Sequence, residues 1–160
     1  MDTTLCAVLK AREVLQDVTP LNADCGRFCG AACCAGDDET GMLLFPGEAP
    51  LYRDCAFGRV IPANFSLGGK PARLFVCGGS CARSERPLAC RIFPLLVSPQ
   101  PQGASLRMDP RSAGVCPLYG SGLSGLAPGF RDAAGRAAEI LAEEPECRRF
   151  LQDLSRQLEL

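Results

Sequence analysis

The chain has 160 residues, of which 47% are hydrophobic and 22% charged, a composition that favours one folded domain and excludes a disordered chain. Its formal net charge is −1, from 17 basic and 18 acidic residues, so the sequence lacks the basic stripe of a nucleic-acid-binding protein. The longest apolar runs, such as LACRIFPLLV, fall short of the roughly 18 residues that span a bilayer, so we expect neither nucleic acid nor a membrane as a partner.

The first predicted element is a helix over residues 3–17, in which apolar residues recur on one face. Thr19 and Pro20 are expected to end it. A signal peptide would start with basic residues and continue with an unbroken apolar stretch, and Asp2 and Lys10 break that pattern. The sequence therefore predicts a cytoplasmic protein.

The middle of the chain predicts short β-hairpins separated by irregular segments. Residues 41–52 contain two prolines and are expected to form loops and turns. Residues 56–76 suit a hairpin with GGKP as its turn. Residues 91–98 predict another strand, and residues 104–109 can return as its partner after the turn PQPQG.

The C-terminal part predicts helices. Residues 120–129 are rich in glycine and serine and are expected to be a flexible connector. Residues 130–158 follow a helical pattern, which Pro145 should split in two. We therefore predict a small single α+β domain over residues 1–160, with helices at both ends around an irregular, cysteine-rich middle.

Eleven cysteines and no histidine limit the chemistry of any functional site. In a reducing cytosol, clustered cysteines are more often metal ligands or redox groups than disulfides. Without histidine, mixed Cys/His zinc sites and Cys-His or Ser-His catalytic pairs are excluded. Any soft-metal site must therefore use thiolates.

Three of the eleven cysteines are predicted to be structural. Cys6 and Cys147 fall in the terminal helices, where a lone cysteine behaves as a small buried apolar residue. Cys55, in YRDCAFG, is the less clear case and is grouped with them. Eight cysteines remain, enough for two four-thiolate centres or for one centre with four to spare: Cys25, Cys29, Cys33, Cys34, Cys77, Cys81, Cys90 and Cys116.

The first four form a block, CGRFCGAACC. In a helix, Cys25, Cys29 and Cys33 would share one face, and Cys34 would point away from it. In an extended segment, Cys33 and Cys34 would again project to opposite sides. We therefore expect at least four of the eight thiols to converge on one metal, drawn from both cysteine blocks.

The second block, FVCGGSCARSERPLACRIFP, places a tight turn between Cys77 and Cys81 and continues to Cys90. Cys116 is the expected last ligand. Arginines beside these thiols could offset the negative charge of a four-thiolate site or could be ordinary surface charges. These arginines are Arg83, Arg86 and Arg91.

The two blocks follow one order along the chain: CxxxCxxxCC, a glycine-flanked cysteine, RPLACRIFP and one late cysteine. This order resembles the CxxCxxCC family of zinc- or iron-chelating (YkgJ-like) proteins. The resemblance covers residues 25–117, the expected metal-binding region, and RP-x-x-CR-x-FP is its most specific part. Both gaps in the first block have three residues where the family has two. The resemblance implies that the eight cysteines bind zinc or an iron–sulfur cluster such as [4Fe–4S].

The sequence thus favours a cysteine-ligated metal-binding protein. Because some members of that family act as flagellin lysine methylases, a component or relative of a protein lysine N-methylase is the alternative. The chain has no GxGxG-type cofactor loop after a strand, so we do not expect a complete enzyme. A secreted disulfide-linked domain is a third interpretation, which the odd number of cysteines disfavours.

Overall fold

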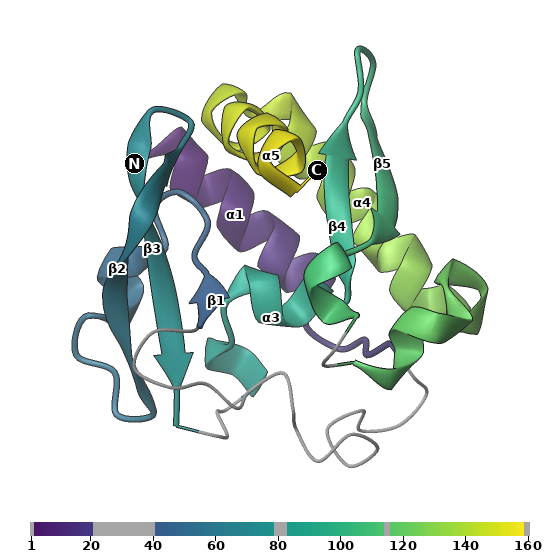
Figure 1. Cartoon of the computed structure of the whole chain (residues 1–160), viewed down its shortest axis with the longest axis horizontal. Helices are drawn as coiled ribbons and strands as arrows, with labels where there is room; N and C mark the ends of the chain where they lie inside the picture. The colour runs from purple at the N-terminus through teal and green to yellow at the C-terminus, as the bar shows by residue number, and fades with distance from the viewer. Residues whose placement is uncertain (1, 21–40, 79–82, 114–115, 159–160) are drawn as a thin grey trace.

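The computed structural model describes residues 2–20, 41–78, 83–113 and 116–158. Within these ranges the fold is a small α+β domain, as predicted: α1 (Thr3–Val14) lies at the start of the chain, and α4 (Pro128–Glu143) and α5 (Pro145–Leu158) lie at its end. Two antiparallel hairpins occupy the middle. In Figure 1, α1 lies between the hairpin of β2 (Gly58–Leu67) and β3 (Lys70–Cys77) on one side and the hairpin of β4 (Leu95–Pro99) and β5 (Ala104–Met108) on the other.

Helix α1 begins after an N-cap residue that accepts a backbone N–H of the first turn. The carboxylate of Asp2 accepts a hydrogen bond from the Thr4 N–H at 2.9 Å. The helix ends at Val14, earlier than the predicted residue 17, because the Leu15 N–H donates to the Arg12 carbonyl three residues back and closes the last turn.

The first sheet has the order β1-β3-β2. The predicted hairpin is confirmed as β2 (Gly58–Leu67) and β3 (Lys70–Cys77). Its turn is shorter than GGKP, since Gly68 and Gly69 alone form it, with φ of 61° and 80°. Two successive positive φ angles match the twist of paired strands and favour glycine at both positions.

The segment predicted as loops and turns also contributes a short strand. Strand β1 (Met42–Leu43) pairs with β3, and the 3₁₀ turn η2 (Ala49–Tyr52) follows it. Two residues are too few for an alternating pattern, so the strand cannot be recognised from the sequence.

The second hairpin consists of β4 (Leu95–Pro99) and β5 (Ala104–Met108), and it confirms the predicted pairing. The predicted start of its first strand is wrong, because Arg91 and Ile92 belong to the short helix α3 (Leu88–Ile92). The side chain of Glu48 accepts the Leu88 N–H and so caps this helix from a distant part of the chain.

The segment predicted as a connector, residues 120–129, contains the end of the 3₁₀ turn η5 (Pro117–Ser121), the 3₁₀ turn η6 (Leu123–Gly125) and the first residues of α4, which starts at Pro128 and not at residue 130. Two shorter turns, η3 (Arg83–Glu85) and η4 (Pro110–Ser112), complete the described elements. Pro145 divides the C-terminal helical segment as predicted and is the first residue of α5.

The main core lies where α1, α4 and α5 meet the two hairpins. Helix α4 turns an alanine-rich face inward, which lets α1 pack closely against it; these buried alanines are Ala133, Ala134, Ala137 and Ala138. Cys147 on α5 is fully buried in this core, as predicted, and burial raises the pKa of its thiol. Cys6 on α1 is half-buried.

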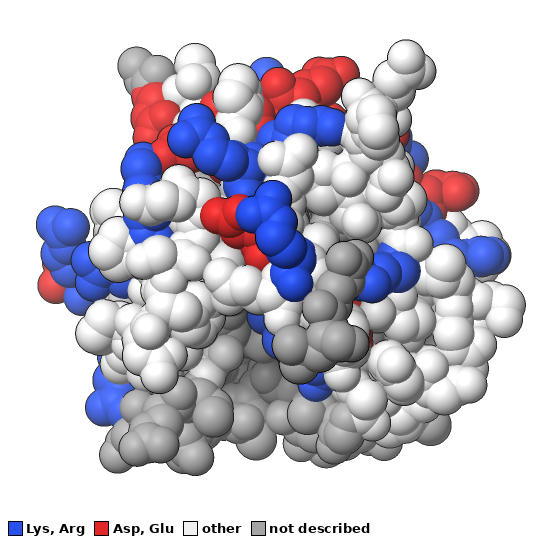
Figure 2. Space-filling view, turned by 45° about the horizontal axis from the view of Figure 1, so that its top comes forward, with Lys and Arg blue, Asp and Glu red and all other residues white. Residues whose placement is uncertain are grey.

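On the face shown in Figure 2, acidic and basic side chains are mixed with one another, and most of them lie in the upper half of the view. Ion pairs join Lys70 to Glu146 and Arg156 to Asp153. Among the helices within the described ranges, none has the length and apolar character needed to cross a bilayer.

Candidate metal centre

The eight predicted metal ligands fall into two groups. Five of them lie outside the described residues: Cys25, Cys29, Cys33, Cys34 and Cys81. The expectation that Cys33 and Cys34 point in opposite directions therefore also lies outside them. The remaining three are placed by three separate elements, and two of them, Cys77 and Cys116, lie within two residues of a part of the chain that the structure does not describe.

Cys77 is the last residue of β3 and stands opposite Gly58 of β2. The pairing continues one step further, because the Gly78 N–H donates to the Phe57 carbonyl at 2.8 Å. Cys77 is half-buried and packs against a small aromatic cluster. The buried members of this cluster are Leu44, Tyr52 and Phe75.

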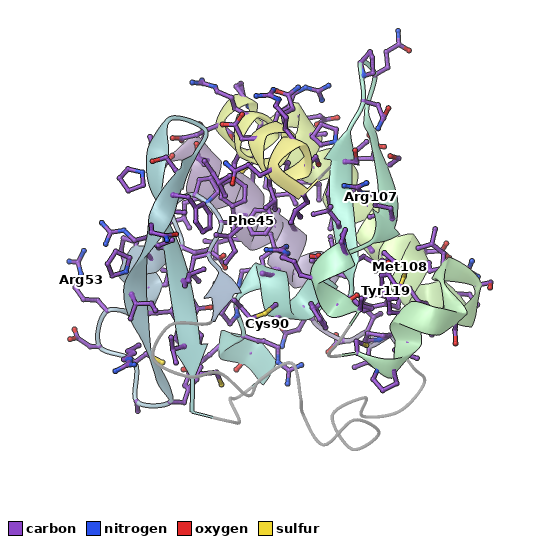
Figure 3. The ribbon with its side chains drawn as sticks, viewed as in Figure 1. Phe45, Arg53, Cys90, Arg107, Met108 and Tyr119 are labelled. Carbon is purple, nitrogen blue, oxygen red and sulfur yellow. The ribbon has the colours of Figure 1, made fainter. Side chains whose placement is uncertain are left out.

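Cys90 is half-buried on α3, in the lower half of the view in Figure 3. Burial is the main cause that raises the pKa of Tyr52; the negative charge of Glu48 adds to the shift, and the positive charges of Arg12 and Arg91 oppose it. A thiolate at Cys90 would raise the pKa of Tyr52 further, so Cys90 lies within electrostatic range of a residue of the cluster that Cys77 contacts.

Cys116 is fixed at the N-terminal end of η5. Its N–H donates to the Ser112 carbonyl at 2.8 Å, and its own carbonyl accepts from the Tyr119 N–H at 3.1 Å. Its side chain packs at the edge of the main core and not against the aromatic cluster. Within the described ranges, no three Cys, Asp or Glu side chains come together as a metal site.

Arg91, the residue after Cys90, has a specific structural role. Its side chain is buried, with only 6% of the residue exposed, so the interpretation of Arg91 as a surface charge is wrong. Its Nε donates to the Arg86 carbonyl at 2.7 Å and its Nη2 to the Ser84 carbonyl at 3.0 Å. Its Nη1 donates to the Arg12 carbonyl at 3.0 Å and also to the side-chain oxygen of Gln16.

Glu48 is the second buried charge near α3, and its residue is fully buried. One carboxylate oxygen accepts the Phe45 N–H at 2.9 Å and the other accepts the Leu88 N–H at 3.0 Å. The guanidinium of Arg12 lies 3.7 Å from the same carboxylate. Burial raises the pKa of Glu48, and the two N–H bonds and the charges of Arg12 and Arg91 oppose that shift.

These charges form one connected network around α3. Arg12 lies over the ring of Tyr52, 5.9 Å from its centroid, and the Tyr52 hydroxyl donates to the Glu85 carbonyl at 2.7 Å. Burial is the main cause that lowers the pKa of Arg91, and the positive charge of Arg12 adds to it. The network holds α3, η3 and the end of α1 together and so fixes the backbone on both sides of Cys90.

Sequence reasoning did not identify Arg12, Glu48 or Tyr52. One signal was available for Arg12, because it is four residues after Val8 and so lies on the apolar face of the first helix. A charged residue on such a face usually has a buried partner. For Glu48 no comparable signal exists, since it sits in a proline-rich turn without periodicity.

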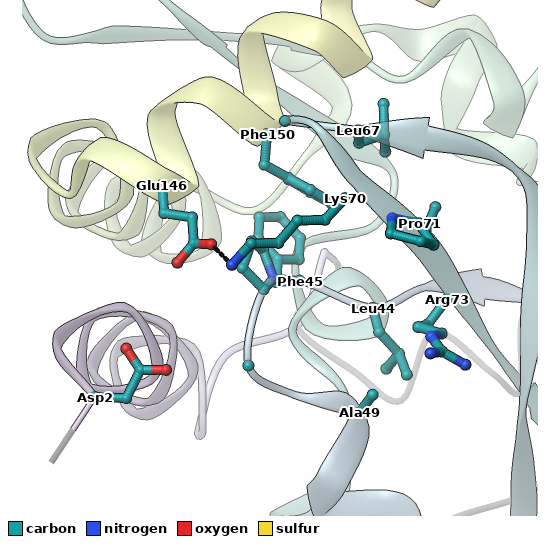
Figure 4. Close-up of a pocket in the computed structure, with 14 residues that line it drawn as sticks. Asp2, Leu44, Phe45, Ala49, Leu67, Lys70, Pro71, Arg73, Glu146 and Phe150 are labelled. Atoms are coloured by element: carbon teal, nitrogen blue, oxygen red, sulfur yellow. Dashed lines mark hydrogen bonds and ion pairs between the residues drawn. The ribbon is translucent and has the colours of Figure 1, made fainter.

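A separate pocket of about 250 Å³ lies between the first sheet and α5, and Figure 4 shows Lys70 paired with Glu146 inside it. Glu146 also accepts a hydrogen bond from the Thr4 hydroxyl, and the bonds from Lys70 and Thr4 lower its pKa. None of the described residues that line this pocket is a cysteine. Its volume is below the roughly 300 Å³ at which ligand cavities usually begin.

Comparison of the chain with protein-family models, with curated proteins and with solved structures gives no match. The resemblance to the CxxCxxCC family therefore rests on the residues quoted from the sequence.

Proposed function

We propose that this chain is a cysteine-ligated metal-binding protein of the CxxCxxCC type, which holds an iron–sulfur cluster or zinc with thiolates from both cysteine blocks. The observation that carries the proposal is the sequence pattern of eight clustered cysteines in a chain without histidine. The proposal also assigns the protein to the cytoplasm, where thiols stay reduced.

The positions of two of the three described candidate ligands support this proposal. Cys77 packs against the aromatic cluster that contains Tyr52, and Cys90, on a different element, lies within electrostatic range of Tyr52. Cys77 directly precedes the segment that contains Cys81, and in Figure 1 the end of β3 and α3 both lie in the lower half of the view. Ligands on separate, well-packed elements can hold a metal in a fixed geometry.

Thiolate ligands fit both zinc and an iron–sulfur cluster. Thiolates are soft ligands that select zinc and iron–sulfur clusters over magnesium and calcium. Four thiolates satisfy tetrahedral zinc and equally satisfy a [4Fe–4S] cluster. A complete site needs further thiolates besides Cys77 and Cys90, and the sequence offers Cys116 and the five predicted ligands outside the described residues.

Elemental analysis of protein made with and without air tests the proposal. We expect anaerobic protein to be brown and to contain iron and sulfide, and aerobic protein to contain zinc or a partly filled site. The double variant Cys77→Ser/Cys90→Ser should lose the metal, and the matched control Cys6→Ser/Cys55→Ser, also at half-buried cysteines, should keep it.

Two outcomes would contradict different parts of the proposed function. Zinc at full occupancy in both preparations, without sulfide, would make this a plain zinc protein and refute the iron–sulfur cluster. Absence of any metal from both preparations would refute metal binding itself.

A further inference from the structure

We propose that the pocket between the first sheet and α5 binds the C-terminal residue of a peptide, which joins the open edge of β3 as a short parallel strand. The residues that line the pocket all belong to the described part of the chain, and none of them is a predicted metal ligand. The proposal therefore does not rest on the proposed function. A volume of about 250 Å³ is small for a whole ligand molecule but suits one residue at the end of a chain.

The pairing of the first sheet shows which backbone groups of β3 face the pocket. The Gly78 N–H donates to the Phe57 carbonyl, and hydrogen-bonded pairs in an antiparallel ladder recur at every second residue. By this alternation Arg73, opposite Pro62, belongs to a pair that exchanges no hydrogen bonds. The N–H and the carbonyl of Arg73 therefore point away from β2. Its carbonyl confirms this, because it accepts the Leu44 N–H at 2.9 Å on the side of β1.

Two backbone groups remain at this open edge of β3, the carbonyl of Pro71 and the N–H of Arg73. Pro71 lies two residues before Arg73 on the strand, so its carbonyl points to the same side. After Leu44 the chain turns away from β3, since the Phe45 carbonyl accepts the Glu48 N–H. Within the described ranges, neither the Pro71 carbonyl nor the Arg73 N–H has a hydrogen-bond partner. One acceptor and one donor are thus presented to the pocket.

A parallel strand pairs with such an edge by placing one residue between the two groups. The N–H of a residue beside Ala72 can donate to the Pro71 carbonyl, while its own carbonyl accepts the Arg73 N–H. Leu44 already occupies the position beside Arg73, so the added chain has to end there. The bound residue is therefore C-terminal, and its carboxylate accepts the Arg73 N–H. The exposed side chain of Arg73 adds a positive charge that attracts this carboxylate.

The side chain of the bound residue lies on the same face of the sheet as that of Ala72, which packs into the main core. The pocket wall on this face is apolar and is formed by Phe45, Leu67 and Phe150. The rings of Phe45 and Phe150 lie 5.0 Å apart, and Figure 4 shows them together beside the strand. The pocket therefore selects an apolar C-terminal residue such as leucine.

The experiment follows amide hydrogen exchange of the full chain by NMR, with and without the acetylated peptide Gly-Ser-Gly-Ser-Leu carrying a free carboxylate. The peptide is raised to about 2 mM, which occupies about two-thirds of a site with a Kd of about 1 mM. We expect the Arg73 amide to exchange about threefold more slowly, or slower still, when peptide is present. The Leu74 amide, which faces β2, is the internal control and should not change.

Two variants and a modified peptide test the geometry. Ala72→Leu fills the pocket from β3 and should abolish the slowing, whereas Ala104→Leu makes the same change on β5, outside the pocket, and should keep it. Arg73→Ala retains the backbone N–H and removes only the charge, so it should weaken binding of the free acid about twofold to fivefold. The same peptide with a C-terminal carboxamide should bind more weakly than the acid to the wild type.

Three results would overturn the proposal. The first is an unchanged Arg73 amide at the highest peptide concentration, and the second is equal slowing by the acid and the carboxamide. The third is slowing that persists in Ala72→Leu; if that variant does not fold, equal binding of the acid by Arg73→Ala and wild type replaces it. None of these results bears on metal binding, so the proposed function is tested separately.

Discussion

Replacing Glu48 by alanine should lower the free energy of unfolding by about 3–5 kcal/mol, a loss typical of breaking a buried, hydrogen-bonded ion pair. The substitution leaves the Phe45 and Leu88 N–H groups without their acceptor and removes the carboxylate beside Arg12. In a domain of this size, each kcal/mol corresponds to about 2–4 °C in melting temperature. Urea unfolding and thermal melts monitored by circular dichroism would measure both quantities.

Two further variants make this test specific. Glu143→Ala removes an exposed carboxylate on α4 and should change stability by less than about 0.5 kcal/mol. Glu48→Gln keeps the shape of the side chain but not its charge or its second acceptor oxygen, so it should show most of the loss of Glu48→Ala. If Glu48→Ala were as stable as Glu143→Ala, the network around α3 would not contribute to the fold.

Cys90→Ser should lower the melting temperature of metal-loaded protein by about 10 °C relative to wild type. A ligand present at about 1,000 times its dissociation constant stabilises the folded state by about 4 kcal/mol, and a site that loses one of its thiolates loses most of that gain. Thermal melts of protein with and without an excess of a strong chelator would measure the metal-dependent part.

Cys55→Ser is the control for Cys90→Ser, because both cysteines are half-buried and Cys55 is outside the predicted ligand set. Cys147 is less suitable, since a serine hydroxyl at this fully buried position would itself be destabilising. With chelator present, the two variants should melt within a few degrees of each other. Equal melting temperatures in the metal-loaded state would contradict the division into ligand and structural cysteines.

The elements with strong local signals were predictable from the sequence. The hairpin of β2 and β3 has an apolar-rich segment on each side of a pair of glycines, and the C-terminal helices are divided by Pro145. The start of β4 was misplaced because RIFPLLVS is a continuous apolar run, and such a run does not distinguish a strand from a short buried helix. The tertiary hydrogen bond from Leu88 to Glu48 decides in favour of the helix there.

For the candidate site, too, the sequence predicts only the features that depend on residue type and spacing. Counting and spacing of cysteines indicate which residues can be ligands, because thiolate chemistry is a property of the residue type. Spacing does not reveal what holds the ligand segments in place. From the sequence alone, Arg91 suits a surface charge and a counter-charge for thiolates equally well. Its contacts with α1 and η3 join residues that are distant in sequence, so they appear only in the folded structure.

X-ray absorption spectroscopy at the edge of the bound metal tests the central claim most directly, because it reports the atoms in the first coordination shell. We predict a shell of sulfur atoms alone, at about 2.3 Å for zinc, with iron neighbours in the second shell if a cluster is bound. Nitrogen or oxygen ligands at about 2.0–2.2 Å as the main component of the first shell would contradict it.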